Sequence, residues 1–144
     1  MQLLMASSLG RNFILFLALL YTVALTMGSL IKPVTIVDRP FQSMDKVMHL
    51  VAYFGLFLLW SVWQLFVRRD LVGKKKMMSL RKIMTITAVV AVAYGIIIEV
   101  CQGLLTDYRT PDGWDILANT TGVLLGVLVL HLFINNIESL KSKF

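Results

Sequence analysis

Residues 83–105 read IMTITAVVAVAYGIIIEVCQGLL, and Glu99 is the one charged side chain in this run of 23 residues. Three further runs, 12–31, 47–67 and 116–134, contain no Asp, Glu, Lys or Arg. A helix rises about 1.5 Å per residue, so each run can cross a hydrocarbon core of about 30 Å. Lipid also requires each spanning segment to pair its own backbone polar groups, which favours helices. The sequence therefore predicts an all-α integral membrane bundle of four transmembrane helices.

The composition agrees with a membrane protein and argues against a soluble enzyme. Of 144 residues, 58% are hydrophobic and 15% are charged, and the mean hydropathy is +0.78. The connections between the runs are too short for a second domain. We therefore expect a single domain over residues 1–144, with its helices in up-down antiparallel order. A cleaved secretory signal at 12–31 is the less favoured alternative, because no Ala-x-Ala-like site closes that run.

The basic residues are divided unevenly between the two sides of the predicted bundle. Seven lie in the connection 68–82, and the segments before the first run and after the fourth bring that side to ten, against four in the loops 32–46 and 106–115. Because an excess of Lys and Arg marks cytoplasmic loops, we expect an N-in/C-in topology with the loops 32–46 and 106–115 outside. This topology accounts for the net charge of +6 without a nucleic-acid partner. The basic loop can also attract anionic membrane lipids.

Three groups of polar residues fall at the same outward-facing membrane edge in this topology. An ionisable residue within a span is costly, so Glu99 indicates a functional site, and Gln102 lies on nearly the same helix face. The other two groups come from the start of the second run and from the residues around the start of the fourth: Asp45, Lys46, His49, Arg109, Asp112, Asp115 and Asn119. Helices packed about 8–10 Å apart would bring these side chains into one polar pocket open to the outside.

The residue types in this predicted pocket favour the binding of an anion with proton transfer beside it. Arg109 offers a planar fork for phosphate or carboxylate. His49 can exchange a proton near neutral pH beside Asp45 or Glu99, so these three residues are the predicted catalytic groups. The predicted ligand-binding residues are Lys46, Gln102, Arg109, Asp112, Asp115 and Asn119. His49 with several carboxylates is a set of hard ligands for a metal, but the chain has no compact ligand motif such as His-Glu-x-x-His, so neither a metal nor a cofactor is predicted.

The residues at the predicted membrane edge also have structural interpretations. Asp45 and Asp115 stand where helix N-caps are expected, and carboxylates there accept backbone hydrogen bonds in any protein. Asp112 lies between Pro111 and Gly113, a pattern typical of a turn. Lys46 can keep its ammonium in water at the interface.

The predicted intramembrane polar residues have a structural alternative as well. His49 and Asn119 can hydrogen-bond between helices and so hold the bundle together. Glu99 can form a buried pair with Arg109 or Lys46. In this interpretation the polar residues stabilise the fold and bind no ligand.

Small residues follow one face of the fourth predicted helix. Ala118, Gly122 and Gly126 are spaced four apart, which leaves a stripe with almost no side chain. A neighbouring backbone can approach closely along such a stripe. Packing within the chain is the more economical interpretation, and contact with a second copy or another membrane protein is the alternative.

The polar residues occur in a characteristic order along the chain. The pattern is Asp45-Lys46-x-x-His49 with Tyr53, then Glu99-x-x-Gln102, then Arg109-x-x-Asp112-x-x-Asp115-x-x-x-Asn119-x-x-Gly122, all between Phe41 and Gly126. This order and spacing resemble those of the VanZ-like family of bacterial membrane proteins. The resemblance implies a small multi-helix protein of the bacterial cytoplasmic membrane, in a family named for a protein linked to low-level teicoplanin resistance.

The leading functional prediction is a cell-envelope protein whose pocket binds or modifies an anionic envelope lipid or a cell-wall precursor, with an effect on glycopeptide susceptibility. Whether it catalyses a reaction is left open. A non-catalytic bundle that docks a membrane partner is the alternative. A proton-coupled transporter is the second alternative, disfavoured because inverted repeats are absent and the inner half shows no matching polar cluster.

Overall fold

The computed structural model describes residues 2–31, 42–70, 78–106 and 112–141. These residues form four helices and no strand: α1 (Gln2–Leu30), α2 (Gln42–Asp70), α3 (Leu80–Leu105) and α4 (Gly113–Lys141). Each helix contains a stretch long and apolar enough to cross a membrane. The predicted all-α membrane bundle is confirmed, whereas the N-in/C-in orientation stays a prediction.

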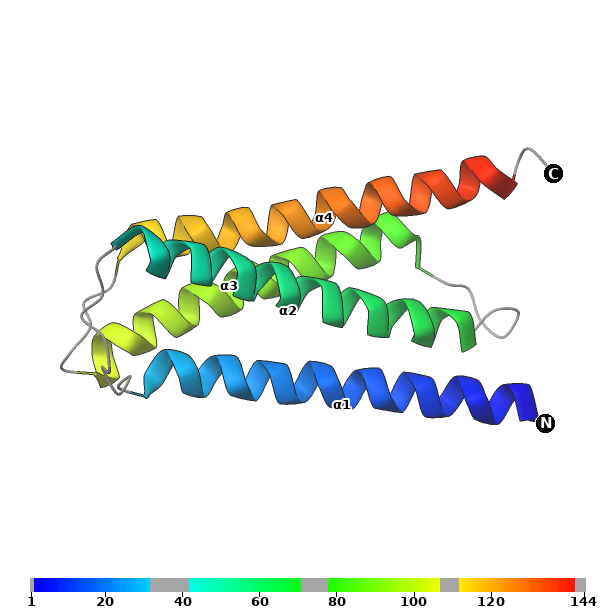
Figure 1. Cartoon of the computed structure of the whole chain (residues 1–144), viewed down its shortest axis with the longest axis horizontal. Helices are drawn as coiled ribbons and strands as arrows, with labels where there is room; N and C mark the ends of the chain where they lie inside the picture. Colours follow the sequence, from blue (N-terminus) through cyan, green and yellow to red (C-terminus); the bar gives the residue numbers. More distant parts are fainter. Residues whose placement is uncertain (1, 32–41, 71–77, 107–111, 142–144) are drawn as a thin grey trace.

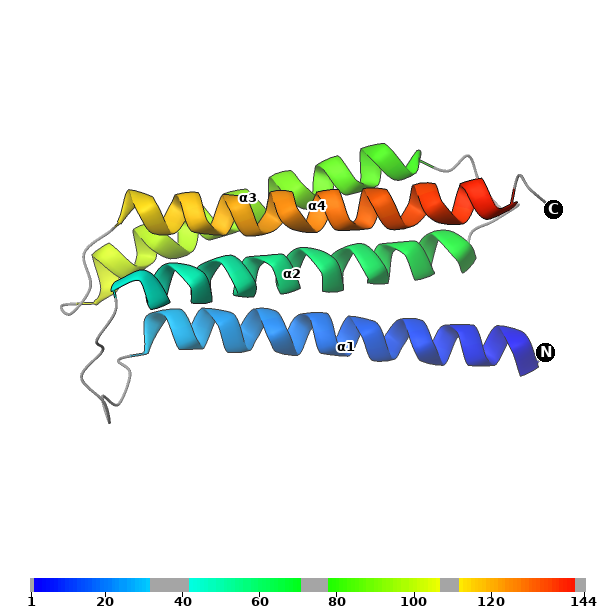
Figure 2. The same cartoon turned by 45° about the horizontal axis from the view of Figure 1, so that its top comes forward.

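Consecutive helices run antiparallel, so the bundle has two distinct ends (Figure 1). At one of them, which we call the distal end, α1 and α3 end and α2 and α4 begin. At the opposite, terminal end, α1 begins and α4 ends. α2 lies between α1 and α4 (Figure 2) and packs against all three other helices. Within the described ranges, α1 contacts α2 and α3 but not α4.

The starts of α2 and α4 change the expected role of two acidic residues. α2 begins at Gln42 and α4 at Gly113, so Asp45 and Asp115 lie inside the first turns of their helices. The residue that caps α4 is Asp112, whose Oδ1 accepts a hydrogen bond of 2.9 Å from the backbone N–H of Trp114. The N-cap prediction for Asp45 and Asp115 is therefore wrong, although both carboxylates still face the positive end of a helix dipole.

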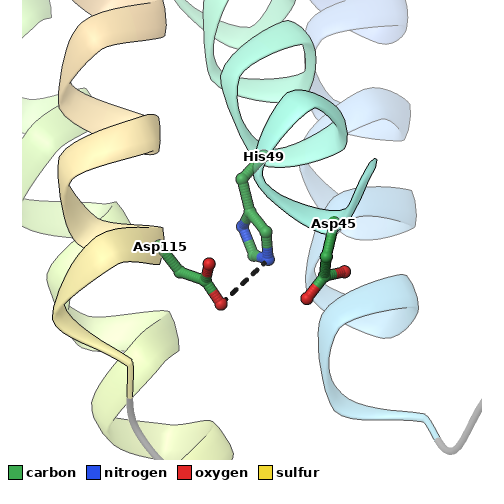
Figure 3. A group of neighbouring side chains, drawn as sticks. All are labelled: Asp45, His49 and Asp115. Carbon is green, nitrogen blue, oxygen red and sulfur yellow. Dashed lines mark ion pairs between the residues drawn. The ribbon is translucent and has the colours of Figure 1, made fainter. Parts of the chain in front are cut away.

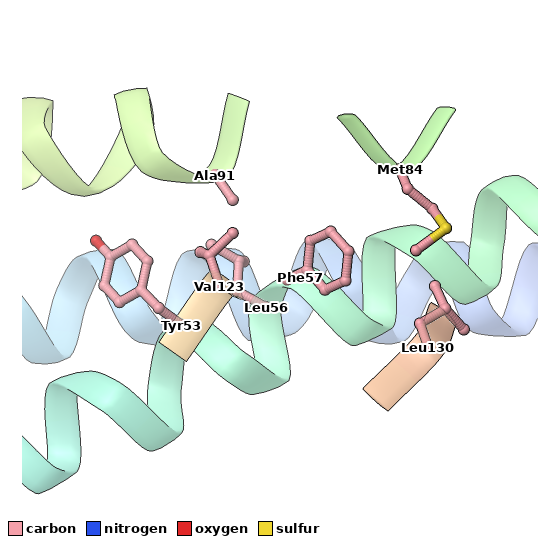
Figure 4. Close-up of a cluster of buried hydrophobic side chains, with 7 residues drawn as sticks. All are labelled: Tyr53, Leu56, Phe57, Met84, Ala91, Val123 and Leu130. Atoms are coloured by element: carbon pink, nitrogen blue, oxygen red, sulfur yellow. The ribbon is translucent and has the colours of Figure 1, made fainter. Parts of the chain in front are cut away.

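The apolar core lies in the middle of the bundle. Its buried members come from α2, α3 and α4: Tyr53, Leu56, Phe57, Met84, Ala91, Val123 and Leu130 (Figure 4). A Cβ atom at Gly122 would overlap the carbonyl oxygen of Leu50, and one at Gly126 would lie 2.6 Å from Cδ1 of Phe57. Glycine at these two positions therefore lets α4 lie directly against α2. At Gly122 and Gly126 the small-residue stripe of α4 thus packs within the chain, against α2. Contact with a partner through Ala118, Gly122 and Gly126 stays a prediction.

Candidate functional site

The predicted site residues that the structure describes gather at the distal end of the bundle. Asp45, Lys46 and His49 come from the first two turns of α2, Glu99 and Gln102 from the last two turns of α3, and Asp112, Asp115 and Asn119 from the start of α4. Arg109 lies outside the described residues. Because α2 and α4 begin where α3 ends, segments far apart in the sequence meet at this one end.

Lys46 joins α2 to the start of α4. Its Nζ lies 2.8 Å from Oδ2 of Asp112 and 3.2 Å from Oδ1 of Asp115. The hydrogen bond from Lys46, supported by the backbone N–H of Trp114, holds the pKa of the Asp112 carboxyl below its usual range. The described ion pairs of Lys46 are thus with these two aspartates, and the alternative that pairs Lys46 with Glu99 is wrong.

His49 forms the second link between α2 and α4. Its Nδ1 lies 3.1 Å from Oδ1 of Asn119, and its Nε2 lies 3.7 Å from Oδ2 of Asp115. Figure 3 shows the imidazole between Asp115 on one side and Asp45 on the other. The ring is 9% exposed and Asn119 is 2% exposed, so both polar groups lie inside the protein. One nitrogen or oxygen from each of Asp45, His49 and Asp115 lies within 4.8 Å of the others.

Glu99 links α3 to α4 through a backbone group. Its side chain is 2% exposed, and Oε1 accepts a hydrogen bond of 2.7 Å from the backbone N–H of Asp112. Its second oxygen, Oε2, is buried and has no hydrogen-bond partner among the described residues. An unpaired carboxylate oxygen is costly in a low-dielectric surrounding. The structure therefore agrees with the sequence in placing an ionisable group at Glu99 where it is energetically unfavourable.

Two further buried oxygens lack hydrogen-bond partners near this end. The Tyr53 hydroxyl is one, and Oε1 of Gln102 is the other, although Nε2 of Gln102 donates to the carbonyl oxygen of Ser29 at 2.9 Å. Tyr53 was not among the predicted site residues. Its position four residues after His49, on the same helix face, is the signal that identifies it.

Two cavities lie on the bundle. One, of about 230 Å³, is lined by Leu25, Gly28, Ser29, Asp45, Met48, His49 and Ala52, which come from α1 and α2. Asp45 and His49 are the members of the predicted site that line it, so the larger polar pocket stays a prediction. The second cavity, of about 240 Å³, lies farther along α2 among Thr22, Leu56, Trp60, Gln64, Ile86, Thr87, Val90, Ala91 and Tyr94.

The half of the bundle nearer the termini also contains buried polar contacts. Gln64 Nε2 donates to Oγ1 of Thr87 at 2.6 Å, and Thr87 is 5% exposed. Ser61 is 1% exposed, and its hydroxyl has no hydrogen-bond partner. The expectation that this half shows no polar counterpart is therefore wrong for uncharged side chains.

Four helices of membrane-spanning length and apolarity define a multi-pass helical membrane protein, and the described residues of the predicted site gather at its distal end. The family model VanZ/LLP1 matches residues 2–134, nearly the whole chain. The chain therefore belongs to the VanZ family, which confirms the resemblance. Neither a curated protein nor a solved structure matches the chain.

Proposed function

We propose that the chain is a protein of the bacterial cytoplasmic membrane whose distal end faces outward and binds or modifies an anionic envelope lipid or a cell-wall precursor. The orientation rests on the basic residues, ten on the side of the termini and four on the other. In this orientation the polar network of the distal end meets the headgroups of the outer leaflet.

The observation that carries the proposal is the collection of buried ionisable groups at the membrane edge. Glu99 and Asp115 are 2% and 6% exposed, and His49 lies against Asp115. Ionisable side chains at such positions are costly and usually serve a function. Lys46 is the described cation next to them, and an incoming phosphate or carboxylate would compete with Asp112 for its ammonium.

The proposed roles follow from these positions. Lys46 and Arg109 hold the anionic group of the ligand, and His49 and Glu99 handle protons in any reaction. The remaining proposed contacts orient the ligand or these groups: Asp45, Gln102, Asp112, Asp115 and Asn119. Proton transfer is assigned to His49 because imidazole titrates near neutral pH.

Binding is tested with the purified chain in nanodiscs that contain either zwitterionic lipid alone or added anionic lipid and lipid-linked pyrophosphate. We expect saturable binding of the anionic species, and we expect Lys46→Gln to weaken it. Lys82→Gln is the matched control, because Lys82 is exposed near the start of α3 at the other end of the bundle. If both variants weaken the binding of the anionic lipid equally, the binding depends on the general positive charge of the protein and not on Lys46.

Catalysis is tested in cells that lack the gene, scored by glycopeptide susceptibility. We expect His49→Gln to insert and fold but to fail in complementation, whereas His131→Gln, which changes the other histidine, complements. Full complementation by His49→Gln would remove proton transfer at this residue from the proposal.

A second candidate function, a non-catalytic bundle that docks a partner, is supported by a different observation. The distal side chains bind one another: Lys46 contacts two aspartates, and Gln102 donates to Ser29 O. In this case Glu99→Gln and Arg109→Ala lower the Tm in detergent, and any loss of function equals the loss of folded protein. A function lost from a fully folded variant would exclude it.

The transporter alternative gains no comparable support. In the described part of the chain α1 and α4 each contact α2 and α3, and α2 and α3 also contact each other across the middle of the bundle. A transport path through a single copy would have to pass between α2 and α3.

A further inference from the structure

We propose that Asp45, His49 and Asp115 form a binding site for one divalent transition-metal cation, with Zn²⁺ as the best-fitting ion. Each residue offers one ligand atom, and the three atoms lie within 4.8 Å of one another. Two ligands of a zinc ion lie about 3.4 Å apart, because each sits about 2.1 Å from the metal. Small rotations of the two aspartate side chains would bring the three ligand atoms from the observed spacing to the spacing that zinc requires. The inference does not depend on which envelope ligand binds, but with the metal bound His49 is a ligand and no longer the proton-transfer group of the proposed function.

The orientation of His49 is the first observation that points to a metal. An amide oxygen only accepts hydrogen bonds, so the 3.1 Å contact with Oδ1 of Asn119 requires the hydrogen on Nδ1 of the ring. The lone pair of the neutral ring is then on Nε2, which faces the carboxylates (Figure 3). Metal-binding histidines are oriented by an acceptor on their other nitrogen in the same way.

The environment of Nε2 is the second observation. His49 is buried, and the 3.7 Å between its Nε2 and Oδ2 of Asp115 is too long for a hydrogen bond. In the neutral form of the ring, the Nε2 lone pair and the Asp115 carboxylate repel each other, and a cation held between them removes this repulsion, as a second proton on the ring also would. The distance leaves room for a shared cation, because two ligands of one metal do not touch each other.

The two oxygens of Asp115 have separate roles in this arrangement. Oδ1 accepts from Nζ of Lys46 at 3.2 Å, whereas Oδ2 is turned toward His49. Lys46 therefore orients the ligand carboxylate from outside the coordination sphere, as Asn119 orients the imidazole. The neutral ring and two carboxylates carry a charge of −2, which balances a divalent ion.

The ligand set selects the class of metal. One imidazole and two carboxylates suit Zn²⁺ or Mn²⁺ better than Mg²⁺ or Ca²⁺, which prefer oxygen ligands alone. The cavity of about 230 Å³ between α1 and α2 is lined by Asp45 and His49 and gives the ion an entry path. Three protein ligands leave a coordination position for water or a ligand oxygen, as in catalytic zinc sites.

The sequence places His49 and several carboxylates at one edge but supports a metal site only weakly, because the ligands come from two helices. Asp45 and His49 share one face of α2, but Asp115 belongs to α4. Motifs such as His-Glu-x-x-His detect ligands that are close in sequence. No metal was predicted because the three ligands are not close in sequence and form no such motif.

The test uses the full chain in detergent micelles, stripped with a chelator and then titrated with Zn²⁺, Mn²⁺ or Mg²⁺ under equilibrium dialysis. We expect one equivalent of Zn²⁺ to bind and the Tm to rise on binding. His49→Gln and Asp45→Asn should each remove stoichiometric binding. Asn119→Ala should weaken it by about 10- to 100-fold, because it acts through the imidazole.

Two control variants separate the site from general charge effects. Asp112→Asn removes a neighbouring carboxylate that contacts Lys46 but supplies no ligand, and His131→Gln removes the other histidine. Both should bind Zn²⁺ as the wild type does. Asp45→Asn leaves the contacts of His49 with Asn119 and of Lys46 with Asp115 in place, so it decides the question even where His49→Gln fails to fold.

Several results would overturn the inference. One is folded wild-type protein that binds no stoichiometric Zn²⁺, as expected for a protonated His49 paired directly with Asp115. Another is unchanged Zn²⁺ affinity in Asp45→Asn. A third is Mg²⁺ binding as tight as that of Zn²⁺, which would contradict the role of the imidazole.

Discussion

α2 meets α4 by two different means along its length. At the distal end the two helices are joined by directed polar contacts, Lys46 with Asp112 and Asp115, and His49 with Asn119. Over the next two turns of α4 the helices meet through close packing, which depends on the absence of a side chain at Gly122 and Gly126. In lipid, apolar side chains gain no hydrophobic driving force by meeting each other, so the middle depends on close fit. The polar end adds specificity, and we expect it to contribute less stability.

The largest expected effect comes from filling the closest contact in the middle. Gly122→Ala places a Cβ atom against the backbone oxygen of Leu50, which cannot rotate away. We expect a loss of about 3 kcal/mol or more in the free energy of unfolding, measured by denaturant titration in mixed micelles. Gly28→Ala is the control, since a Cβ there meets nothing within 4 Å. Because Ala favours a helix more than Gly does, Gly28→Ala should not destabilise the protein, and similar losses in both variants would show that the contact with Leu50 is not the cause.

A smaller loss is expected one turn farther along α4. Gly126→Ala places a Cβ atom 2.6 Å from Cδ1 of Phe57, a side chain that can shift at some cost. We expect about 1–2 kcal/mol of destabilisation by the same titration. Adding Phe57→Leu should recover part of it, because the flat ring that causes the clash is gone. If the double variant is less stable than the sum of the two single losses predicts, the clash is not the cause.

At the polar end, the loss of one directed contact should cost less than either glycine change. Asn119→Ala removes the acceptor from Nδ1 of His49, and interhelical hydrogen bonds in membrane proteins contribute about 1 kcal/mol. We expect a destabilisation of that size in metal-free protein. A double-mutant cycle with His49→Ala measures the coupling directly. A loss as large as that of Gly122→Ala would reverse the ranking of the two regions.

The smallest effect concerns pH. Because Lys46 holds the pKa of Asp112 below its usual range, this carboxylate stabilises the fold above its unfolded pKa of about 3.9, and the contribution is lost as pH falls through the lower folded value. The Tm of the wild type should exceed that of Asp112→Asn at pH 7, and the difference should shrink below pH 4. A difference that stays constant across this range would mean that the charge of Asp112 is not involved.

The fold could be predicted because charge is excluded from hydrocarbon. Glu99 is the one charged residue within the four predicted spans. Each of these nearly uncharged runs was long enough to predict one of the four helices. The helix starts were less predictable. The lack of charge marks the hydrocarbon boundary, whereas hydrogen bonds continue past it, which is why Asp115 lies inside α4 and Asp112 caps it.

The faces of the site could be predicted, but the partners could not. Spacing of four residues places Asp45 with His49 and Asp115 with Asn119 on their respective helices. Which aspartate meets Lys46 depends on the rotation and the axial offset of α4 against α2, and no local pattern encodes either. Contacts between single uncharged residues, such as Gln64 with Thr87, give still less signal, because neither residue stands out in an apolar run.

The position of α1 at the edge of the bundle sets the order in which the chain can assemble. α1 bonds to α2 and α3, through Tyr21 to Ala52 O and through Thr26 to Tyr94, and so docks before α4 is needed. The hydrogen-bond partners of Lys46 and His49 at the start of α4 are Asp112, Asp115 and Asn119. A nascent chain that ends before Asp112 would hold three inserted helices and no distal network. The contacts of Lys46 and His49 therefore form only once α4 has packed against α2.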